Sequence, residues 1–203
     1  MIKRSSKSYI DKLLNENPNW KILDIGCGYT AHKNANVICD VQDLSHFYKE
    51  KKIIKLTGNI LPFKDKEFDF IIASHVIEHV EDIDLFIKEL QRVSLKGYIE
   101  LPTILDDNLV FENKKEHLWH MEFDDINNQL MVSKKIQFIE PVLTVSSEKN
   151  LLKYFRQSLV IELFWENSIE FRIIEKENEN YKKISRASLL RKFVSKLFRN
   201  IIR

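Results

Sequence analysis

The sequence predicts an α/β protein with a doubly wound, mostly parallel sheet, followed by an antiparallel hairpin and a C-terminal amphipathic helix. Three observations support this fold class. Two of the four glycines in the chain, Gly26 and Gly28, directly follow an apolar run. Strand-like apolar runs then alternate with helical or loop segments as far as Pro102. Beyond Pro102 the apolar runs instead come in pairs around short polar turns, as in hairpins.

The first predicted element is an amphipathic helix over residues 5–14, ended by the polar, proline-containing segment NENPN. Five short apolar runs then predict five strands, and the fourth run is continuously apolar, as a central parallel strand should be. These strands are expected at 20–25, 36–41, 52–56, 68–74 and 98–101. Between the last two, Asp82 is expected to cap a helix whose apolar residues recur at helical spacing.

Two hairpins are predicted after the fifth strand. The first has strands at 118–123 and 130–135 around DDINNQ, and the second has strands at 159–165 and 169–175 around ENS. An antiparallel hairpin at one edge would complete a mixed sheet. We divide the chain into a domain at 1–180 and a basic tail at 181–203.

The tail differs from the domain in charge. It holds eight cations and no acid, so that with a net charge of +2 the remaining residues 1–180 sum to −6. From Ser185 on, bulky apolar residues follow helical spacing and the cations take other positions. Such a helix can lie in an anionic membrane surface, or it can pack on the body or on a second subunit. Nucleic-acid binding is disfavoured because no reader motif or stacking platform accompanies the cations.

Composition excludes several other classes of protein. No apolar run is long enough to span a membrane as a helix, and the basic start of the chain lacks the apolar stretch of a signal peptide. Cys27 and Cys39 fall in predicted core elements without ligand spacing, so we expect neither a disulfide nor a metal site. The expected location is cytoplasmic, with peripheral contact at the inner face of the membrane if residues 185–203 bind lipid.

The glycine loop carries the strongest functional signal. Gly26-x-Gly28-x-x-Ala31 fits a dinucleotide fingerprint, which is weak on its own. Asp24 precedes the first glycine by two residues, and Asp40 ends the next strand, where a carboxylate can accept both ribose hydroxyls. Only 11 residues separate Gly28 from Asp40. The first crossover must therefore be abbreviated, because a full helix and a strand do not fit.

Five segments occur in the order found in a known family. They are LDIGCG at 23–28, the strand-end Asp40, GNILPF at 58–63, FDFIIASHVIEHV at 68–80, and ELQRV at 89–93 before KGYIELP. Over roughly residues 20–102 the chain resembles the class I S-adenosylmethionine-dependent methyltransferases, in particular those with an LDxGCG signature. The resemblance implies a Rossmann-like fold and S-adenosylmethionine as cofactor.

The resemblance also implies a cofactor site. Its residues would be Asp24, Gly26, Cys27, Gly28, Asp40, Asn59, Ile60, Ser74 and His75. The glycine loop would pack against the methionine part and the ribose through its backbone. Asp24 would orient the amino group, and Asp40 would hold the ribose hydroxyls.

The other end of the cofactor would meet two further segments. By the same resemblance Asn59 and Ile60 would flank the adenine, and Ser74 and His75 would lie under the sulfonium. Asn59 stands where the family more often has Asp, but its carbonyl can still accept a hydrogen bond from the adenine amine.

The acceptor is expected beyond the carboxyl ends of the strands, in the segment after the fifth strand. His117 and His120 are the candidates there for a base or a hydroxyl ligand, and Trp119 offers an apolar face that suits a sugar ring or a core equally. His79, in SHVIEHV, is a third candidate base, although a histidine there is more often structural.

A narrower resemblance ranks the acceptors. The His-x-Trp segment, the hairpin and the late LVIELFWENSIEFRII are similar to methyltransferases found with enzymes that build bacterial surface polysaccharides. This implies O-methylation of a sugar or glycan. Alternatives are a small-molecule or lipid-quinone acceptor, or a non-catalytic partner protein that only binds the cofactor. An NAD-binding protein is disfavoured by Asp24 and the order of the motifs.

Overall fold

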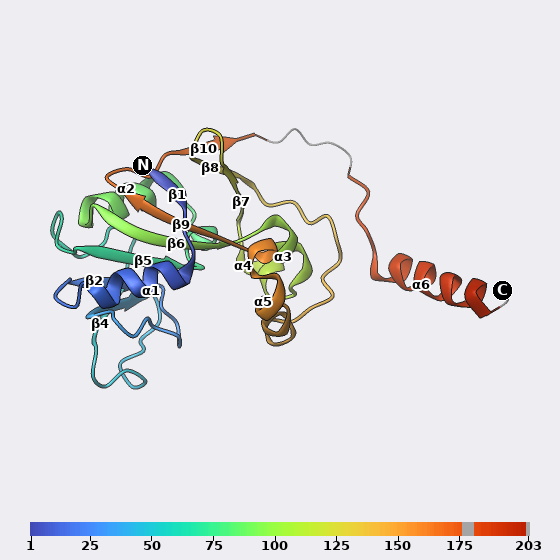
Figure 1. Cartoon of the computed structure of the whole chain (residues 1–203), viewed down its shortest axis with the longest axis horizontal. Helices are drawn as coiled ribbons and strands as arrows, with labels where there is room; N and C mark the ends of the chain where they lie inside the picture. The colour runs from blue at the N-terminus through green and yellow to red at the C-terminus, as the bar shows by residue number, and fades with distance from the viewer. Residues whose placement is uncertain (176–180, 202–203) are drawn as a thin grey trace.

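The centre of the protein is a seven-stranded sheet of order β1-β9-β6-β5-β2-β3-β4 in a computed structural model that describes residues 1–175 and 181–201 (Figure 1). The domain boundary predicted at residue 180 and the last two residues of the tail, 202–203, lie outside these described residues. The strands of the sheet are Ile2–Arg4 (β1), Ile22–Ile25 (β2), Val37–Asp40 (β3), Lys52–Lys55 (β4), Phe70–Ser74 (β5), Lys96–Pro102 (β6) and Val160–Glu166 (β9).

The sheet has the predicted doubly wound, Rossmann-like topology. Strands β2 to β6 are all parallel, and the direction of winding reverses between β2 and β5. All five strands expected before residue 102 are present. The reversal between β2 and β5 opens a crevice at their carboxyl ends, where ligands of such sheets bind.

Helices cover the two faces of the sheet. The helix α1 (Lys7–Glu16) buries Ile10 and Leu14 on one face, and α2 (Ile83–Val93) buries its apolar residues on the other. Asp82 caps α2 as predicted, because its side chain accepts a hydrogen bond from the Leu85 amide. Residues of the central strands β2, β3 and β5 are therefore buried on both sides, which explains their apolar runs.

The crossover between β2 and β3 is abbreviated as predicted and holds no helix. Side chains replace the missing helix. The Lys51 ammonium donates to three carbonyl oxygens of this loop, and the Tyr48 hydroxyl donates to the Gly28 carbonyl and accepts from the Ala31 amide. The third fingerprint position, Ala31, thus lies in a loop and does not pack a helix on the sheet.

A second sheet, of order β10-β8-β7, packs beside α2. Its strands are Trp119–Asp124 (β7), Gln129–Lys134 (β8) and Phe171–Ile174 (β10). The antiparallel β7–β8 hairpin confirms the first predicted hairpin. The second one is wrong as a pair: β9 runs antiparallel between β6 and β1, while β10 pairs in parallel with β8. The open edge of β6 takes β9 because residues of β9 can be buried there on both faces.

Three helices and a 3₁₀ turn connect these sheets near the crevice. They are η1 (Ile77–His79), α3 (Ile104–Leu109), α4 (Asn113–Glu116) and α5 (Val145–Leu159). The turn η1 comes shortly after β5. It contacts the start of β7, because the amide of Leu118, the residue before β7, donates to the Glu78 carbonyl.

The C-terminal helix α6 (Arg186–Ile201) confirms the predicted helix and stands away from the sheets in Figure 1. Its bulky apolar residues Leu190, Phe193 and Phe198 are all more than half exposed. At its start, Arg186 pairs with Glu140 and lies over the Phe111 ring. None of the helices in residues 1–175 and 181–201 combines the length and apolarity needed to cross a bilayer.

Replacing Gly97 with alanine is expected to destabilise the fold by about 3 kcal/mol. A Cβ atom at this position in β6 would lie 2.5 Å from Trp165 Nε1 and 2.7 Å from the Ile71 carbonyl oxygen. Neither the strand backbone nor a fully buried indole can move aside. The measurement is urea unfolding, with Gly58→Ala as control because a Cβ at Gly58 meets nothing within 4 Å. Equal midpoints for both variants would contradict the prediction.

Candidate active site

The glycine loop closes tightly over the carboxyl end of β2. Gly26 and Gly28 both have positive φ, at 61° and 49°. A Cβ atom on Gly26 would lie 2.5 Å from Val76 Cγ2, just after β5. Glycine is therefore required at position 26 both by the backbone conformation and by the close approach of Val76.

The two carboxylates predicted beside this loop are buried and hold its backbone. Asp40 accepts hydrogen bonds from the Gly28 amide at 2.9 Å and from the Gln42 amide at 2.9 Å. Asp24 accepts from the His32 amide at 2.7 Å. Burial raises the pKa of Asp24 to about 6, because the loss of water around a carboxylate outweighs this hydrogen bond. A cation bound beside Asp24 would therefore stabilise its ionised carboxylate.

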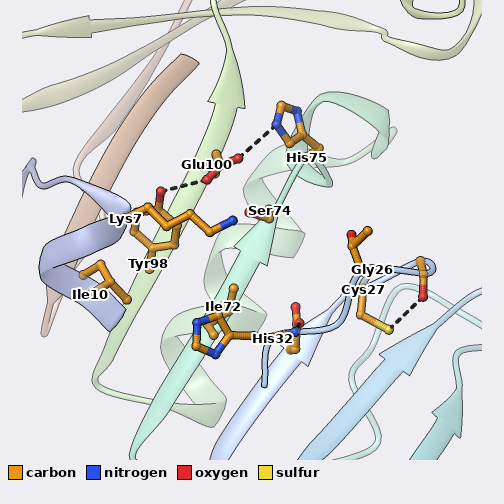
Figure 2. A pocket seen from close by; sticks show the side chains of 13 residues that line it. Lys7, Ile10, Gly26, Cys27, His32, Ile72, Ser74, His75, Tyr98 and Glu100 are labelled. Atoms are coloured by element: carbon orange, nitrogen blue, oxygen red, sulfur yellow. Dashed lines mark hydrogen bonds and ion pairs between the residues drawn. The ribbon is translucent and has the colours of Figure 1, made fainter. Parts of the chain in front are cut away.

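Two adjacent cavities open at the loop. The first, of about 270 Å³, is lined by Asp24, Ser74 and His75, among others, and Figure 2 shows it between α1 and the ends of β2 and β5. The second, of about 680 Å³, is lined by Asp40 and Asn59, among others. Gly26, Gly28 and His75 line both cavities. An elongated ligand can therefore cross the loop from one cavity to the other.

His75 stands at the junction of the cavities in a left-handed conformation with φ 54°. Figure 2 shows its ring pointing at Glu100, with Nε2 3.3 Å from Glu100 Oε1, and its Nδ1 lies 3.3 Å from Glu78 Oε1. Although the loss of water around part of the ring favours its neutral form, these two buried carboxylates raise the pKa of His75 to about 10. His75 is therefore a cation balanced by two acids.

Sequence reasoning missed several residues of the first cavity, among them the charged residues Lys7 and Glu100. Lys7 lies in the first turn of α1, and Figure 2 shows its side chain reaching across the cavity towards Ser74. Glu100 lies in β6, where it also accepts from the Tyr98 hydroxyl and pairs with Arg156. A buried acid within the apolar run YIELP was the available signal for Glu100. No motif marks Lys7.

The histidines predicted near the acceptor converge on one buried carboxylate that the sequence did not reveal. Asp107 in α3 lies 2.6 Å from His117 Nδ1, 3.2 Å from His120 Nε2 and 2.9 Å from Lys135 Nζ. Although burial opposes ionisation, these hydrogen bonds hold the pKa of Asp107 well below its usual range. The ionised carboxylate accepts from His117 Nδ1, so a neutral His117 offers its Nε2 lone pair.

The three candidate catalytic histidines are not equivalent. His117 and His79 pack edge to face with ring centroids 4.6 Å apart. His79 also lines the second cavity. His120 is 1% exposed and lines neither of the two cavities. It therefore contacts Asp107 but cannot contact a ligand in either cavity.

Two other expected residues lie away from the cavities. Trp119 is buried, donates from Nε1 to the Val80 carbonyl and carries Lys134 over its ring, so its face is not open to a sugar. Ile60 is exposed and lines neither cavity, although its neighbours Asn59 and Leu61 line the second. Cys27 lines the first cavity with its thiol mostly buried.

Comparison with known proteins agrees with this geometry. Residues 23–99 match the family model described as a methyltransferase domain. The chain is 32% identical over 120 residues to the uncharacterized protein MJ1123 of Methanocaldococcus jannaschii, covering 54% of this chain and 58% of that one. It is 32% identical over 106 residues to the ubiquinone biosynthesis O-methyltransferase of Pelagibacter ubique, covering 45% and 44%. These matches span about half the length of the two relatives.

Among solved structures, the PH0226 protein from Pyrococcus horikoshii is 15% identical with a TM-score of 0.43, covering 80% of this chain and 92% of that one. The strand order and the glycine loop at the carboxyl ends of the strands define a doubly wound, Rossmann-like fold. Within this fold, residues 23–99 are the part that is similar to a methyltransferase domain.

Proposed function

We propose that this protein transfers a methyl group from S-adenosylmethionine to a hydroxyl group of a sugar or glycan. The observation that carries the methyl-donor half of this proposal is the pair of cavities that meet at the glycine loop, one walled by Asp24 and the other by Asp40. A cofactor with a charged amino acid at one end and a nucleoside at the other fits that division.

The amino acid end of the cofactor is assigned to the first cavity. There Asp24 would pair with the ammonium group, and the Lys7 ammonium would pair with the carboxylate from the opposite wall. Ser74 and His75 would lie beside the sulfonium where the two cavities join. In the second cavity Asp40 would accept from both ribose hydroxyls, and Asn59 would lie beside the adenine.

Methyl transfer itself needs the acceptor oxygen in line with the carbon–sulfur bond at close range. The oxygen forms the new bond to carbon, and the sulfur keeps the electrons of the old one. An alcohol must also lose its proton, and we assign this to the His79–His117 pair at the edge of the second cavity. A neutral imidazole can take the proton, or two imidazoles can hold a cation that acidifies the hydroxyl.

The class of acceptor is proposed from sequence resemblance. The resemblance to methyltransferases found with polysaccharide-building enzymes favours a glycan. A small-molecule or lipid-quinone acceptor is the second candidate, and one relative bears the name of a ubiquinone biosynthesis O-methyltransferase. Transfer of labelled methyl groups to lipid-linked oligosaccharides, but not to quinone precursors, is the expected result. No transfer to either, with intact cofactor binding, would favour a non-catalytic partner protein.

Calorimetric titration tests the cofactor assignment. We expect saturable binding of S-adenosylmethionine and none of NAD. Affinity should fall by about tenfold per pH unit below about pH 6, because protons and the cofactor ammonium compete for the Asp24 carboxylate, whose pKa is raised to about 6. Asp24→Asn should bind weakly and without this pH dependence. An unchanged pH profile in that variant would remove Asp24 from the ammonium site.

We further propose that α6 binds an anionic membrane surface. Its exposed apolar side and its cations are those of a helix that lies in the lipid interface, where each cation adds about 1 kcal/mol. Wild-type protein should sediment with vesicles that contain anionic lipid and not with neutral ones. Deletion of residues 187–203 should abolish this while cofactor affinity is kept, since residues 189–199 of the helix are exposed. Loss of folding on deletion would show a packed helix instead.

A further inference from the structure

The strongest unexplained feature near the second cavity is a buried carboxylate without adequate partners. Glu78 is fully buried in η1. Its Oε2 has no hydrogen-bond partner among the described residues, and its Oε1 has only His75 Nδ1 at 3.3 Å, outside hydrogen-bonding geometry. His75 is shared with Glu100 and balances only part of this charge, and a fully buried carboxylate without hydrogen bonds costs several kcal/mol unless further cations or donors satisfy it.

Two imidazoles lie beside this carboxylate. The ligand atoms offered by Glu78, His79 and His117 all lie within 4.8 Å of one another. Around a metal ion with bonds of about 2.0–2.2 Å, tetrahedral ligand atoms stand about 3.3 Å apart, so side-chain shifts of about 1 Å close the site.

Both imidazoles already have the partners that metal-binding histidines need. His79 Nδ1 lies 3.0 Å from the Glu116 carbonyl oxygen, which can only accept, so Nδ1 carries a proton. His117 Nδ1 donates to the Asp107 carboxylate at 2.6 Å. Each ring is therefore held in the tautomer that leaves Nε2 as a free lone pair. A carbonyl or carboxylate behind each histidine is the usual support of a metal ligand.

The surrounding backbone is also fixed. The carbonyl of Glu78 accepts from the Leu118 amide at 2.8 Å, and the carbonyl of Val80 accepts from Trp119 Nε1 at 2.8 Å. These bonds tie η1 to the start of β7 on both sides of the three side chains. The cluster is thus assembled by the fold without needing an ion to bring distant segments together.

We propose that Glu78, His79 and His117 bind one divalent transition-metal ion. Two imidazoles and one carboxylate suit Zn²⁺, Fe²⁺ or Co²⁺ better than Mg²⁺ or Ca²⁺, which prefer oxygen ligands. Three protein ligands leave a coordination position for water or an acceptor oxygen, and His79 opens onto the second cavity. The ion would satisfy the Glu78 carboxylate. If the proposed function holds, it would also lower the pKa of an acceptor hydroxyl.

The test is a Co²⁺ titration of metal-free protein in the absence of S-adenosylmethionine, so that it does not depend on methyl transfer. We expect a visible absorption band that saturates at about one equivalent and disappears on addition of Zn²⁺. Glu78→Gln, and His79→Ala at the exposed ligand, should each weaken Co²⁺ binding by more than about 100-fold. Asp107→Asn should weaken it by about 10- to 100-fold through His117.

His46→Ala is the matched control, because His46 is exposed and lies outside the cluster. It should bind Co²⁺ as the wild-type protein does. No saturable band in folded wild-type protein would overturn the proposal and leave a buried water as the partner of Glu78. Equal binding by wild type, Glu78→Gln and His79→Ala would overturn it as well.

Discussion

Replacing Asp40 with alanine is expected to weaken S-adenosylmethionine binding by about 100-fold, the largest effect on affinity from one side chain in the site. Two charge-assisted hydrogen bonds to the ribose would be lost. In addition, the amides of Gly28 and Gln42 would lose the carboxylate that now orients both loops. The measurement is calorimetric titration at neutral pH, with circular dichroism to confirm that the variant is folded.

Two further variants separate the causes of that loss. Asp43→Ala removes an exposed acid three residues later that accepts from Ser45 and does not contact the glycine loop, and it should bind the cofactor as wild type does. Asp40→Asn keeps an oxygen that can support one of the two amides but removes the charge. An intermediate affinity is expected for it. Wild-type affinity in Asp40→Ala would place the ribose elsewhere and remove the central support for the assignment of the second cavity.

Replacing His117 with glutamine is expected to slow methyl transfer by about 10²- to 10⁴-fold while cofactor affinity changes little. His117 lines neither cavity that would hold the cofactor, but it contacts His79 at the edge of the second one. Whether it accepts the proton itself or holds an ion that acidifies the hydroxyl, its Nε2 lone pair is required. The assay is transfer of labelled methyl groups to lipid-linked oligosaccharides.

The two roles of His117 differ in their response to metal. If His117 is only a base, a chelator should leave the wild-type rate unchanged. If His117 is a ligand, the chelator should abolish the rate, and Zn²⁺ should restore it in wild type but not in His117→Gln. His46→Ala should keep the wild-type rate throughout. A rate for His117→Gln within about threefold of wild type would exclude both roles.

Much of the fold follows from local pattern. The strand runs at 22–25, 37–40 and 70–74 are mostly apolar and buried on both faces, as is typical of central parallel strands. The cap at Asp82 follows from its position before a helical repeat. The abbreviated crossover after Gly28 is predictable because the 11 residues between Gly28 and Asp40 are too few for a helix and a strand. The positions of Asp24 and Asp40 beside the glycine loop are predictable as well, since Asp24 precedes the loop in its own strand and Asp40 ends the next strand.

The pairing of the late strands was not predictable in this way. Both β9 and β10 have strand-like patterns, and nothing between them shows that they separate. Their partners depend on which sheet edges are open once the rest of the chain has folded. The edge beside β6 takes one strand and the edge beside β8 takes the other. Burial of β9 between β6 and β1 is more favourable than a local hairpin of β9 with β10.

For the cluster of histidines, too, the sequence predicts the residues but not the contacts between them. The histidines at 79, 117 and 120 were visible as residues in the sequence, but Asp107 was not singled out, and no spacing indicated that Glu78 and His117 meet. Periodicity and short motifs report on neighbours along the chain, so they specify the strands, the helix cap and the glycine loop. Contacts between η1 and the start of β7 join residues about 40 positions apart, and Asp107 of α3 meets His117 although no short motif links them. These contacts arise only when the second sheet packs against the first.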